Sequence, residues 1–308
     1  MSTDLLQLIG NTPLVELPRL SPKPAVQLFA KLEGQNPTGS VKDRIVRRMV
    51  EKAADRGDLK AGSTIVEASS GNTAIALAMI GKQRGYQIHV VIPHDVAPSI
   101  ADILALYDTD VTWCPSDGGM KAAIDLARNM AEAGGFYYLD QFDDQENIAT
   151  HYETTGKEIV EALPKVDVFV AGIGTGGTIM GVGRRLREFN PSARLIGVTP
   201  QIGERLQGLR DMSEGYLPPL LDLDTLDRRF LVDSVTAMEA SEQVAQKEGI
   251  LAGISSGATL SVALRLAADL DQGTIVMMFS DGGWKYLPAR PWDAAKAESR
   301  GLDDTHWW

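Results

Sequence analysis

The sequence has only one cysteine and no long run of apolar or of basic residues. With Cys114 alone no internal disulfide can form, which suits a reducing compartment. No apolar run reaches the roughly 18 residues of a membrane-spanning helix, and the N-terminus carries no basic and apolar signal segment. We therefore expect a soluble, cytoplasmic protein that has no membrane partner.

Basic residues are in the minority. The chain has 30 Lys and Arg against 41 Asp and Glu, a net charge of −11, so nucleic acid is not expected as a partner. The 4 histidines have no HExxH or other ligand spacing, and no metal site is predicted. Cys114 ends the segment DVTWC, where packing at the end of a buried strand is a commoner role than catalysis.

What the sequence does have is a regular alternation of short apolar strands with amphipathic helices. From residue 64 the strands TIVEA, QIHVVIP, DVTWC and FYYLD alternate with helical segments, and the pattern restarts after about residue 147. Strands that are apolar throughout indicate parallel sheets with helices on both faces. We predict an α/β fold of two doubly wound, mostly parallel sheets, with the functional site in the cleft between them.

Three turns between a strand and a helix are rich in glycine, serine and threonine. They are EASSGNTA at 67–74, GIGTGGT at 172–178 and GISSGA at 253–258. Helix N-termini with exposed N–H groups bind anions, and glycine lets the ligand approach the backbone closely. Two such sites together suggest ligands with two separated anionic groups.

The GIGTGG segment also fits the dinucleotide-binding pattern G-x-G-x-x-G. That pattern requires an acidic residue at the end of the following strand, for the ribose hydroxyls. Here the strand ARLIGV runs into Thr199 and Pro200, so NAD is disfavoured. A phosphate-binding Walker loop is disfavoured as well, because no Gly-Lys-Ser/Thr follows any of these glycines.

Lys42 lies in the segment NPTGSVKDR, in the first turn of a predicted helix. Ser40 and Asp43 have capping-box-like spacing, so we expect the helix to start at about Ser40 and to bury an apolar face. A cation is unfavourable at a helix N-terminus. An amine becomes useful there if it forms a Schiff base with an aldehyde cofactor. Pyridoxal phosphate would supply that aldehyde and one of the two anions.

Motifs spread over nearly the whole chain resemble the cysteine synthases, which are fold-type II pyridoxal phosphate enzymes related to the tryptophan synthase β subunit. The matching segments, in order, are LIGNTPLV (8–15), KLEGQNPTGSVKDR (31–44), SSGNT (69–73), DQF (140–142), HYETTGKEI (151–159), GIGTGGT, GISSGA and SDGGWKYL (280–287). The resemblance implies a smaller, mobile domain over 36–147, a larger phosphate-binding domain over 1–35 plus 148–308, and a homodimer.

The resemblance also implies residue roles. Lys42 would form the Schiff base and then act as the base at Cα, Asn72 would hydrogen-bond the cofactor's 3-hydroxyl, and Ser255 would contact its pyridine nitrogen. The cofactor's phosphate would be held by the glycine-rich loop, and the amino-acid carboxylate by the serine- and threonine-rich loop together with a glutamine. The phosphate-binding residues would be Gly174, Thr175, Gly176, Gly177 and Thr178. The carboxylate-binding residues would be Ser69, Ser70, Asn72, Thr73 and Gln141.

The expected reaction is β-replacement. A hydroxyl such as that of Ser255 does not enforce a protonated pyridinium, and so suits elimination to an aminoacrylate followed by addition. O-acetylserine or O-phosphoserine would lose its leaving group, and sulfide, thiosulfate or a sulfur-carrier protein's thiocarboxylate would give cysteine. The alternatives are a lyase that releases sulfide from cysteine, a synthase for another β-substituted alanine, and a catalytically weak interaction protein that binds the cofactor.

Some segments bear on the substrate. GLRDMSEGYLPPL (208–220) resembles a loop of the B-type synthases, so Arg210 is a candidate for binding a leaving phosphate; the alternative is a surface arginine paired with Asp211 or Glu214. The predicted helix in 92–108 lacks the arginines that the family has there. In the family this helix borders the mobile part of the cleft, so the difference could affect how the cleft closes. The chain ends in Trp307 and Trp308, either as a disordered tail or docked in a groove.

Overall fold

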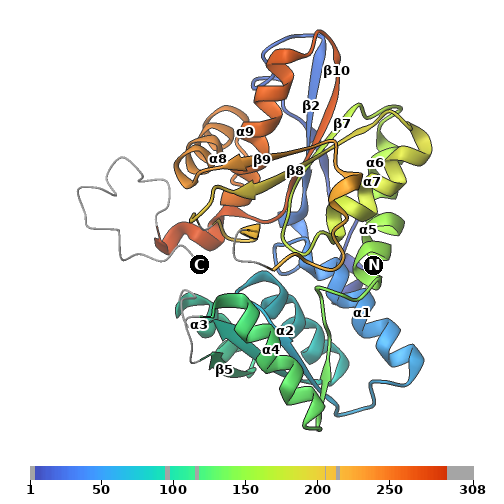
Figure 1. The fold of residues 1–308 in the computed structure, drawn as a ribbon, viewed down its shortest axis with the longest axis vertical. Helices are drawn as coiled ribbons and strands as arrows, with labels where there is room; N and C mark the ends of the chain where they lie inside the picture. The colour runs from blue at the N-terminus through green and yellow to red at the C-terminus, as the bar shows by residue number, and fades with distance from the viewer. Residues whose placement is uncertain (1–3, 94–97, 115–117, 205, 213–215, 290–308) are drawn as a thin grey trace.

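The structure, a computed structural model, is built on two β-sheets, which lie one above the other in Figure 1. It describes residues 4–93, 98–114, 118–204, 206–212 and 216–289. Trp307 and Trp308, for which the sequence left a disordered tail and docking in a groove as alternatives, therefore lie outside the described residues. In the described part of the chain, no helix is long and apolar enough to span a bilayer.

The larger sheet has six strands in the order β1-β2-β10-β7-β8-β9. Only β1 runs antiparallel to its neighbour; the other pairs are parallel. Two strands from opposite ends of the chain, β2 and β10, pair over their whole length. The strand bounds are β1 Leu14–Glu16, β2 Val26–Leu32, β7 Val168–Gly172, β8 Arg194–Pro200, β9 Arg228–Val232 and β10 Gly273–Phe279.

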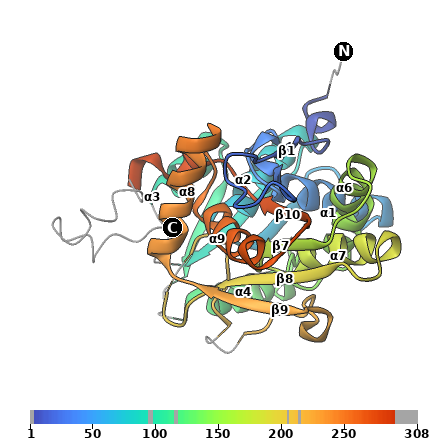
Figure 2. The same cartoon turned by 90° about the horizontal axis from the view of Figure 1, so that it is seen from above.

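Helices cover both faces of this sheet because alternate strand residues point to opposite sides. In β7, Val168 and Val170 pack with α8 and α9, whereas Phe169 and Ala171 pack with α6 and α7. Figure 2 shows α8 and α9 on one side and α7 on the other. The bounds are α5 Glu146–His151, α6 Lys157–Ala162, α7 Gly177–Phe189, α8 Ser234–Glu248 and α9 Ile254–Asp269.

The smaller sheet has four parallel strands in the order β5-β4-β3-β6. Ile65 of β3 faces α1 and α2, whereas Val66 faces α4. The predicted α/β fold with two mostly parallel sheets is therefore confirmed. The bounds are α1 Lys42–Arg56, β3 Thr64–Ala68, α2 Asn72–Arg84, β4 Gln87–Pro93, α3 Pro98–Leu106, β5 Asp110–Cys114, α4 Gly119–Glu132 and β6 Phe136–Tyr138.

The predicted start of the first long helix is wrong by two residues. Helix α1 begins at Lys42, and its N-cap is Val41, which makes no side-chain capping bond. The carboxylate of Asp43 instead accepts hydrogen bonds from the backbone N–H and the hydroxyl of Thr38. Gly39 has φ +80° and turns the chain so that Thr38 lies over Asp43. The predicted apolar face is buried: Ile45, Val46, Met49, Val50 and Ala53.

Three further segments differ from the predictions. The segment HYETTGKEIVEAL at 151–163, whose pattern predicts one continuous helix, is instead divided between α5, a π-helical turn at Tyr152–Gly156 and α6. The strand that ends at Cys114 is at the edge of its sheet and mostly not buried, although Cys114 itself is. In the 92–108 segment, helix α3 covers only Pro98–Leu106, and residues 94–97 lie outside the described part.

Candidate active site

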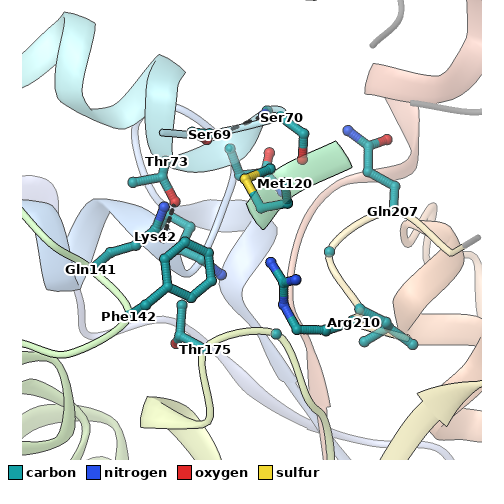
Figure 3. Close-up of a pocket in the computed structure, with 15 residues that line it drawn as sticks. Lys42, Ser69, Ser70, Thr73, Met120, Gln141, Phe142, Thr175, Gln207 and Arg210 are labelled. Carbon is teal, nitrogen blue, oxygen red and sulfur yellow. Dashed lines mark hydrogen bonds between the residues drawn. The ribbon is translucent and has the colours of Figure 1, made fainter. Parts of the chain in front are cut away.

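A cleft with about 560 Å³ of empty space lies where elements of the two sheets meet. Its walls come from the first turn of α1, the turn after β3, the segment after β6, the turn after β7 and residues 207–210 after β8, so it lies at the carboxyl ends of parallel strands. Figure 3 shows side chains from these elements pointing into one space. The structure brings most of the predicted site residues to this lining: Lys42, Ser69, Ser70, Asn72, Thr73, Gln141, Gly174, Thr175 and Arg210.

The other predicted residues lie just behind the lining. Gly176, Gly177 and Thr178 continue the turn into α7. The hydroxyl of Thr178 is 3.2 Å from Nε2 of the buried His151. Ser255 is buried in the first turn of α9, behind Gly208, which lines the cleft; a Cβ on Gly208 would be 3.8 Å from the Ser255 hydroxyl.

The loop before Lys42 is held in place by the last strand's exit turn. The backbone N–H of Val41 donates to the carbonyl of Ser280, and Ser40 forms an isolated β-bridge with Asp281. This places the Lys42 amine in the cleft, close to the charges of Asp281 and Lys285. Burial lowers the pKa of Lys42; the Asp281 carboxylate opposes this shift, and the positive charge of Lys285 adds to it. The amine is therefore more easily deprotonated than a surface lysine.

The turn after β3 presents a polar edge to the cleft. Ser69 serves mainly as an internal acceptor, since its hydroxyl receives hydrogen bonds from the backbone N–H groups of Gly71 (3.2 Å) and Ala74 (3.1 Å). The Thr73 hydroxyl donates to Oε1 of Gln141 at 2.7 Å. Residues far apart in the sequence are thus joined at one wall, with Ser70 beside them.

A buried carboxyl that the sequence analysis did not single out lies behind Gln141. Glu67 is 0% exposed, and the side-chain nitrogen of Gln141 donates to it at 3.4 Å. Burial, reinforced by the negative charge of Asp140, raises the pKa of Glu67 to about 8. The carboxyl is therefore largely protonated at neutral pH. The signal in the sequence was the single charged residue inside the apolar strand TIVEA.

The glycine-rich turn after β7 leaves no room for side chains. A Cβ on Gly174 would be 2.8 Å from the carbonyl of Gly208, and one on Gly177 would overlap Oδ1 of Asn147. Gly176 has φ +88°, in the left-handed region that favours glycine. Asn147 Nδ2 donates to the Thr175 hydroxyl at 3.1 Å. The result is a small polar cradle at the N-terminus of α7, of the kind that binds anions.

Arg210 lies at the opposite wall and is only 8% exposed, so it is not a surface arginine. Its guanidinium lies 5.1 Å from the ring centre of Phe142 and 5.0 Å from that of Tyr216. Figure 3 shows it pointing across the cleft toward the Phe142 ring. Stacking between two aromatic rings fixes a planar cation in orientation.

Comparison with known proteins agrees with this geometry. The family model described as "Pyridoxal-phosphate dependent enzyme" matches residues 5–281. The chain belongs to this family. Cysteine synthase B of Pseudomonas aeruginosa is 37% identical over 286 residues, with 92% of this chain and 96% of the relative covered. The expected resemblance to the cysteine synthases, and the expected cofactor, pyridoxal phosphate, are thereby confirmed.

Two solved structures of this pyridoxal-phosphate dependent family are also similar over most of the chain. An O-ureido-L-serine synthase has a TM-score of 0.90 at 35% identity, covering 95% of this chain and 96% of its own. A hydrogen sulfide-producing enzyme from Fusobacterium nucleatum has a TM-score of 0.88 at 33% identity, covering 93% and 100%. Family members of this shape therefore carry names for different reactions.

The residues present fit the cofactor. Its phosphate requires backbone N–H groups at a helix N-terminus, which the turn 174–178 presents at the start of α7. Gly174 and Gly177 allow this turn its tight path, because a Cβ there would come too close to Gly208 or Asn147. Its aldehyde requires an amine that loses its proton easily, and the pKa of Lys42 is lowered by burial. Both features line or adjoin the same cleft.

Proposed function

We propose that this protein is a cysteine synthase, which replaces the activated hydroxyl of O-acetyl-L-serine or O-phospho-L-serine by sulfide. The observation that carries the proposal is the Lys42 amine, whose pKa burial lowers, in a cleft lined by two polar turns that are suited to anions. Curated relatives named cysteine synthase, at 37% identity over 92% of the chain, support it.

Each predicted residue has a role in this proposal that its position allows. The turn Gly174–Thr178, at the N-terminus of α7, would hold the cofactor's phosphate, and Ser255, in the first turn of α9, would contact its pyridine nitrogen. The substrate carboxylate is bound by the turn after β3 together with Gln141. Asn72 contacts the cofactor's 3-hydroxyl. Pyridoxal phosphate, when bound, supplies an electron-withdrawing ring conjugated to the substrate's Cα.

The side chains then move one proton. The neutral Lys42 amine takes the proton from Cα, and the acetate or phosphate leaves Cβ with the electron pair of its C–O bond. Sulfide forms the new bond at Cβ, and the Lys42 ammonium returns the proton to Cα. A lowered pKa leaves more of the amine neutral at the working pH and makes its ammonium a better donor for the return transfer, and a catalytic group works best when its pKa is near that pH.

Arg210 is positioned to bind the leaving group of the substrate. Its guanidinium lines the cleft and is held by Phe142 and Tyr216. A guanidinium binds phosphate through two parallel hydrogen bonds, which an acetyl ester cannot use equally well. We therefore propose that O-phosphoserine is a substrate and that Arg210 binds its phosphate.

A second candidate function is β-elimination that releases sulfide from cysteine, or synthesis of another β-substituted alanine. The similarity to a hydrogen sulfide-producing enzyme and to an O-ureido-L-serine synthase favours keeping this candidate. We also propose that the protein is a homodimer and that each chain has two domains, one over 36–147 and one over 1–35 plus 148–308. Sulfide, rather than a carrier protein's thiocarboxylate, is the first sulfur donor to test.

The experiment begins with the purified protein and added pyridoxal phosphate. We expect a visible absorption band in the wild type, cysteine formation from a serine ester with sulfide, and loss of both in Lys42→Ala with an unchanged far-UV spectrum. Lys82→Met, at an exposed position of α2, is the control and should behave as wild type. A wild type that stays colourless contradicts the proposal. Sulfide release from cysteine that outpaces cysteine formation selects the second candidate.

A further inference from the structure

The segment SDGGWKYL at 280–287, which the proposed function does not use, contacts the site through Asn72. The Lys285 amine donates to Oδ1 of Asn72 at 2.6 Å, and Nδ2 of Asn72 donates to the Asp281 carboxylate at 2.8 Å. An ammonium group can only donate and a carboxylate can only accept. The two partners therefore fix one of the two orientations of the Asn72 amide.

Asp281 is itself held rigidly. It is 2% exposed, and the Tyr286 hydroxyl donates to it at 2.6 Å. Its other oxygen occupies the space where a Cβ on Gly253 would be, at the N-terminal end of α9, where the helix dipole favours a negative charge. The same segment is bonded, through Ser40, to the loop that leads into Lys42. The Asn72 amide and the Lys42 amine are thus built on one support.

Two amines share this support, but their surroundings differ. Burial lowers the pKa of Lys285, and both Asp281 and Asp43 oppose that shift. Burial also lowers the pKa of Lys42, where Asp281 alone opposes it and Lys285 adds to it. With two carboxylates facing Lys285 and one facing Lys42, the positive charge is more stable on Lys285.

We propose that Lys285 is a positioning residue of this site, which fixes the orientation of the Asn72 amide and whose positive charge adds to the effect of burial in favouring a neutral Lys42 amine. This rests on the proposed function, because that function needs a neutral Lys42 amine. These two different roles explain why two lysines lie in one buried site. One carries the charge and the other provides the nucleophile and base.

The test measures the reactivity of Lys42 in the full-length, cofactor-free protein. Acetic anhydride reacts with neutral amines only, so the extent of Lys42 acetylation across a pH series, followed by mass spectrometry of its peptide, gives the midpoint of its titration. We expect the midpoint in Lys285→Met to lie about one pH unit above that of the wild type. Lys285→Arg keeps the charge and should restore the wild-type midpoint, and Lys82→Met should not change it.

A second arm separates this proposal from the proposed function. Pyridoxal phosphate added before the reagent should protect Lys42 in the wild type; failure to protect contradicts the proposed function. An unchanged Lys42 midpoint in Lys285→Met contradicts the role of Lys285, whatever the cofactor result. Thermal unfolding checks that each variant is folded. If Lys285→Met does not fold, Lys285→Gln, which is neutral but still a hydrogen-bond donor, gives the same comparison of charge.

Discussion

Gln141 is hydrogen-bonded to the buried carboxyl of Glu67 by both its backbone and its side chain. The backbone N–H donates to one oxygen of Glu67 and the side-chain nitrogen to the other, each at 3.4 Å. Gln141 also accepts a hydrogen bond from the Thr73 hydroxyl at the cleft wall. The protonation of Glu67 is therefore linked both to the stability of the fold and to the position of this wall.

Glu67→Gln should make the free energy of unfolding less dependent on pH. The pKa of Glu67 is raised from 4.5 to about 8 in the folded protein, by burial first, so between these values the folded state holds a proton that the unfolded state has lost. Stability from this group is thus lost as pH rises, at about 1.4 kcal/mol per pH unit. Denaturant unfolding of wild type and variant at pH 5.5, 6.5 and 7.5 measures it; parallel curves contradict the raised pKa.

Gly177→Ala should weaken cofactor binding. The new methyl group would overlap Oδ1 of Asn147, whose Nδ2 holds the Thr175 hydroxyl at 3.1 Å and the Gln141 carbonyl at 2.8 Å. Losing these two hydrogen bonds corresponds to roughly tenfold or more in affinity. Absorbance titration with pyridoxal phosphate measures it.

Gly85→Ala is the matched control for that variant. Gly85 follows the end of α2 with φ +75°, whereas Gly177 begins α7; no atom lies within 4 Å of a methyl group added at Gly85, and the residue is remote from the cleft lining. It should lose about 1 kcal/mol of stability from backbone strain and keep its cofactor affinity. Equal affinity losses in the two variants would mean that Gly177 acts only through stability.

Arg210→Ala should separate the two serine esters. If the guanidinium binds the leaving phosphate, kcat/KM for O-phosphoserine falls by roughly 10- to 100-fold, the value of a hydrogen bond to a charged group, whereas O-acetylserine changes much less. Arg210→Lys, which cannot make two parallel hydrogen bonds, should lie between. An equal loss on both esters would show that Arg210 acts only by packing against Phe142 and Tyr216.

Arg44→Met should destabilise the fold strongly. Arg44 is buried between Glu33, at 2.6 Å, and Glu158, at 2.6 Å, and Glu33 is 0% exposed. Removing the cation leaves a buried carboxylate without its partner, which costs about 3–5 kcal/mol. Lys157→Met removes an exposed pair with Glu161 and should cost about 0.5 kcal/mol or less. Urea unfolding at pH 7 compares them; similar losses would contradict the burial argument.

Local pattern predicted much of the fold, because the strands from residue 64 onward are apolar and the intervening helices periodic. It failed where a residue outside the predicted element replaces the expected partner. Asp43 has the spacing of a cap for its own helix, yet it bonds Thr38 across the turn at Gly39. Strands β1 and β2 were not predicted; β1 has only three residues, and β2 pairs with β10 from the other end of the chain.

The candidate site, like the fold, was predicted only in part. The motifs identified Lys42 and the polar turns, whose residues the structure brings to one cleft. They did not identify Lys285 as a partner of Asn72, because that contact joins residues 213 positions apart. Nor did they identify Glu67, whose importance depends on burial beneath Gln141. Sequence spacing describes a residue's neighbours along the chain, whereas these roles depend on neighbours in space that are far apart in the sequence.

The pairing of β2 with β10 has a consequence for how the protein is made. Residues 26–32 leave the ribosome early and must wait for residues 273–279 before the centre of the larger sheet can close. The smaller sheet needs only residues 64–138 and can form long before. Because the segment that holds Asn72 follows β10 directly, the cofactor site is completed last. A nascent or truncated chain that lacks this segment is thereby prevented from presenting a finished site.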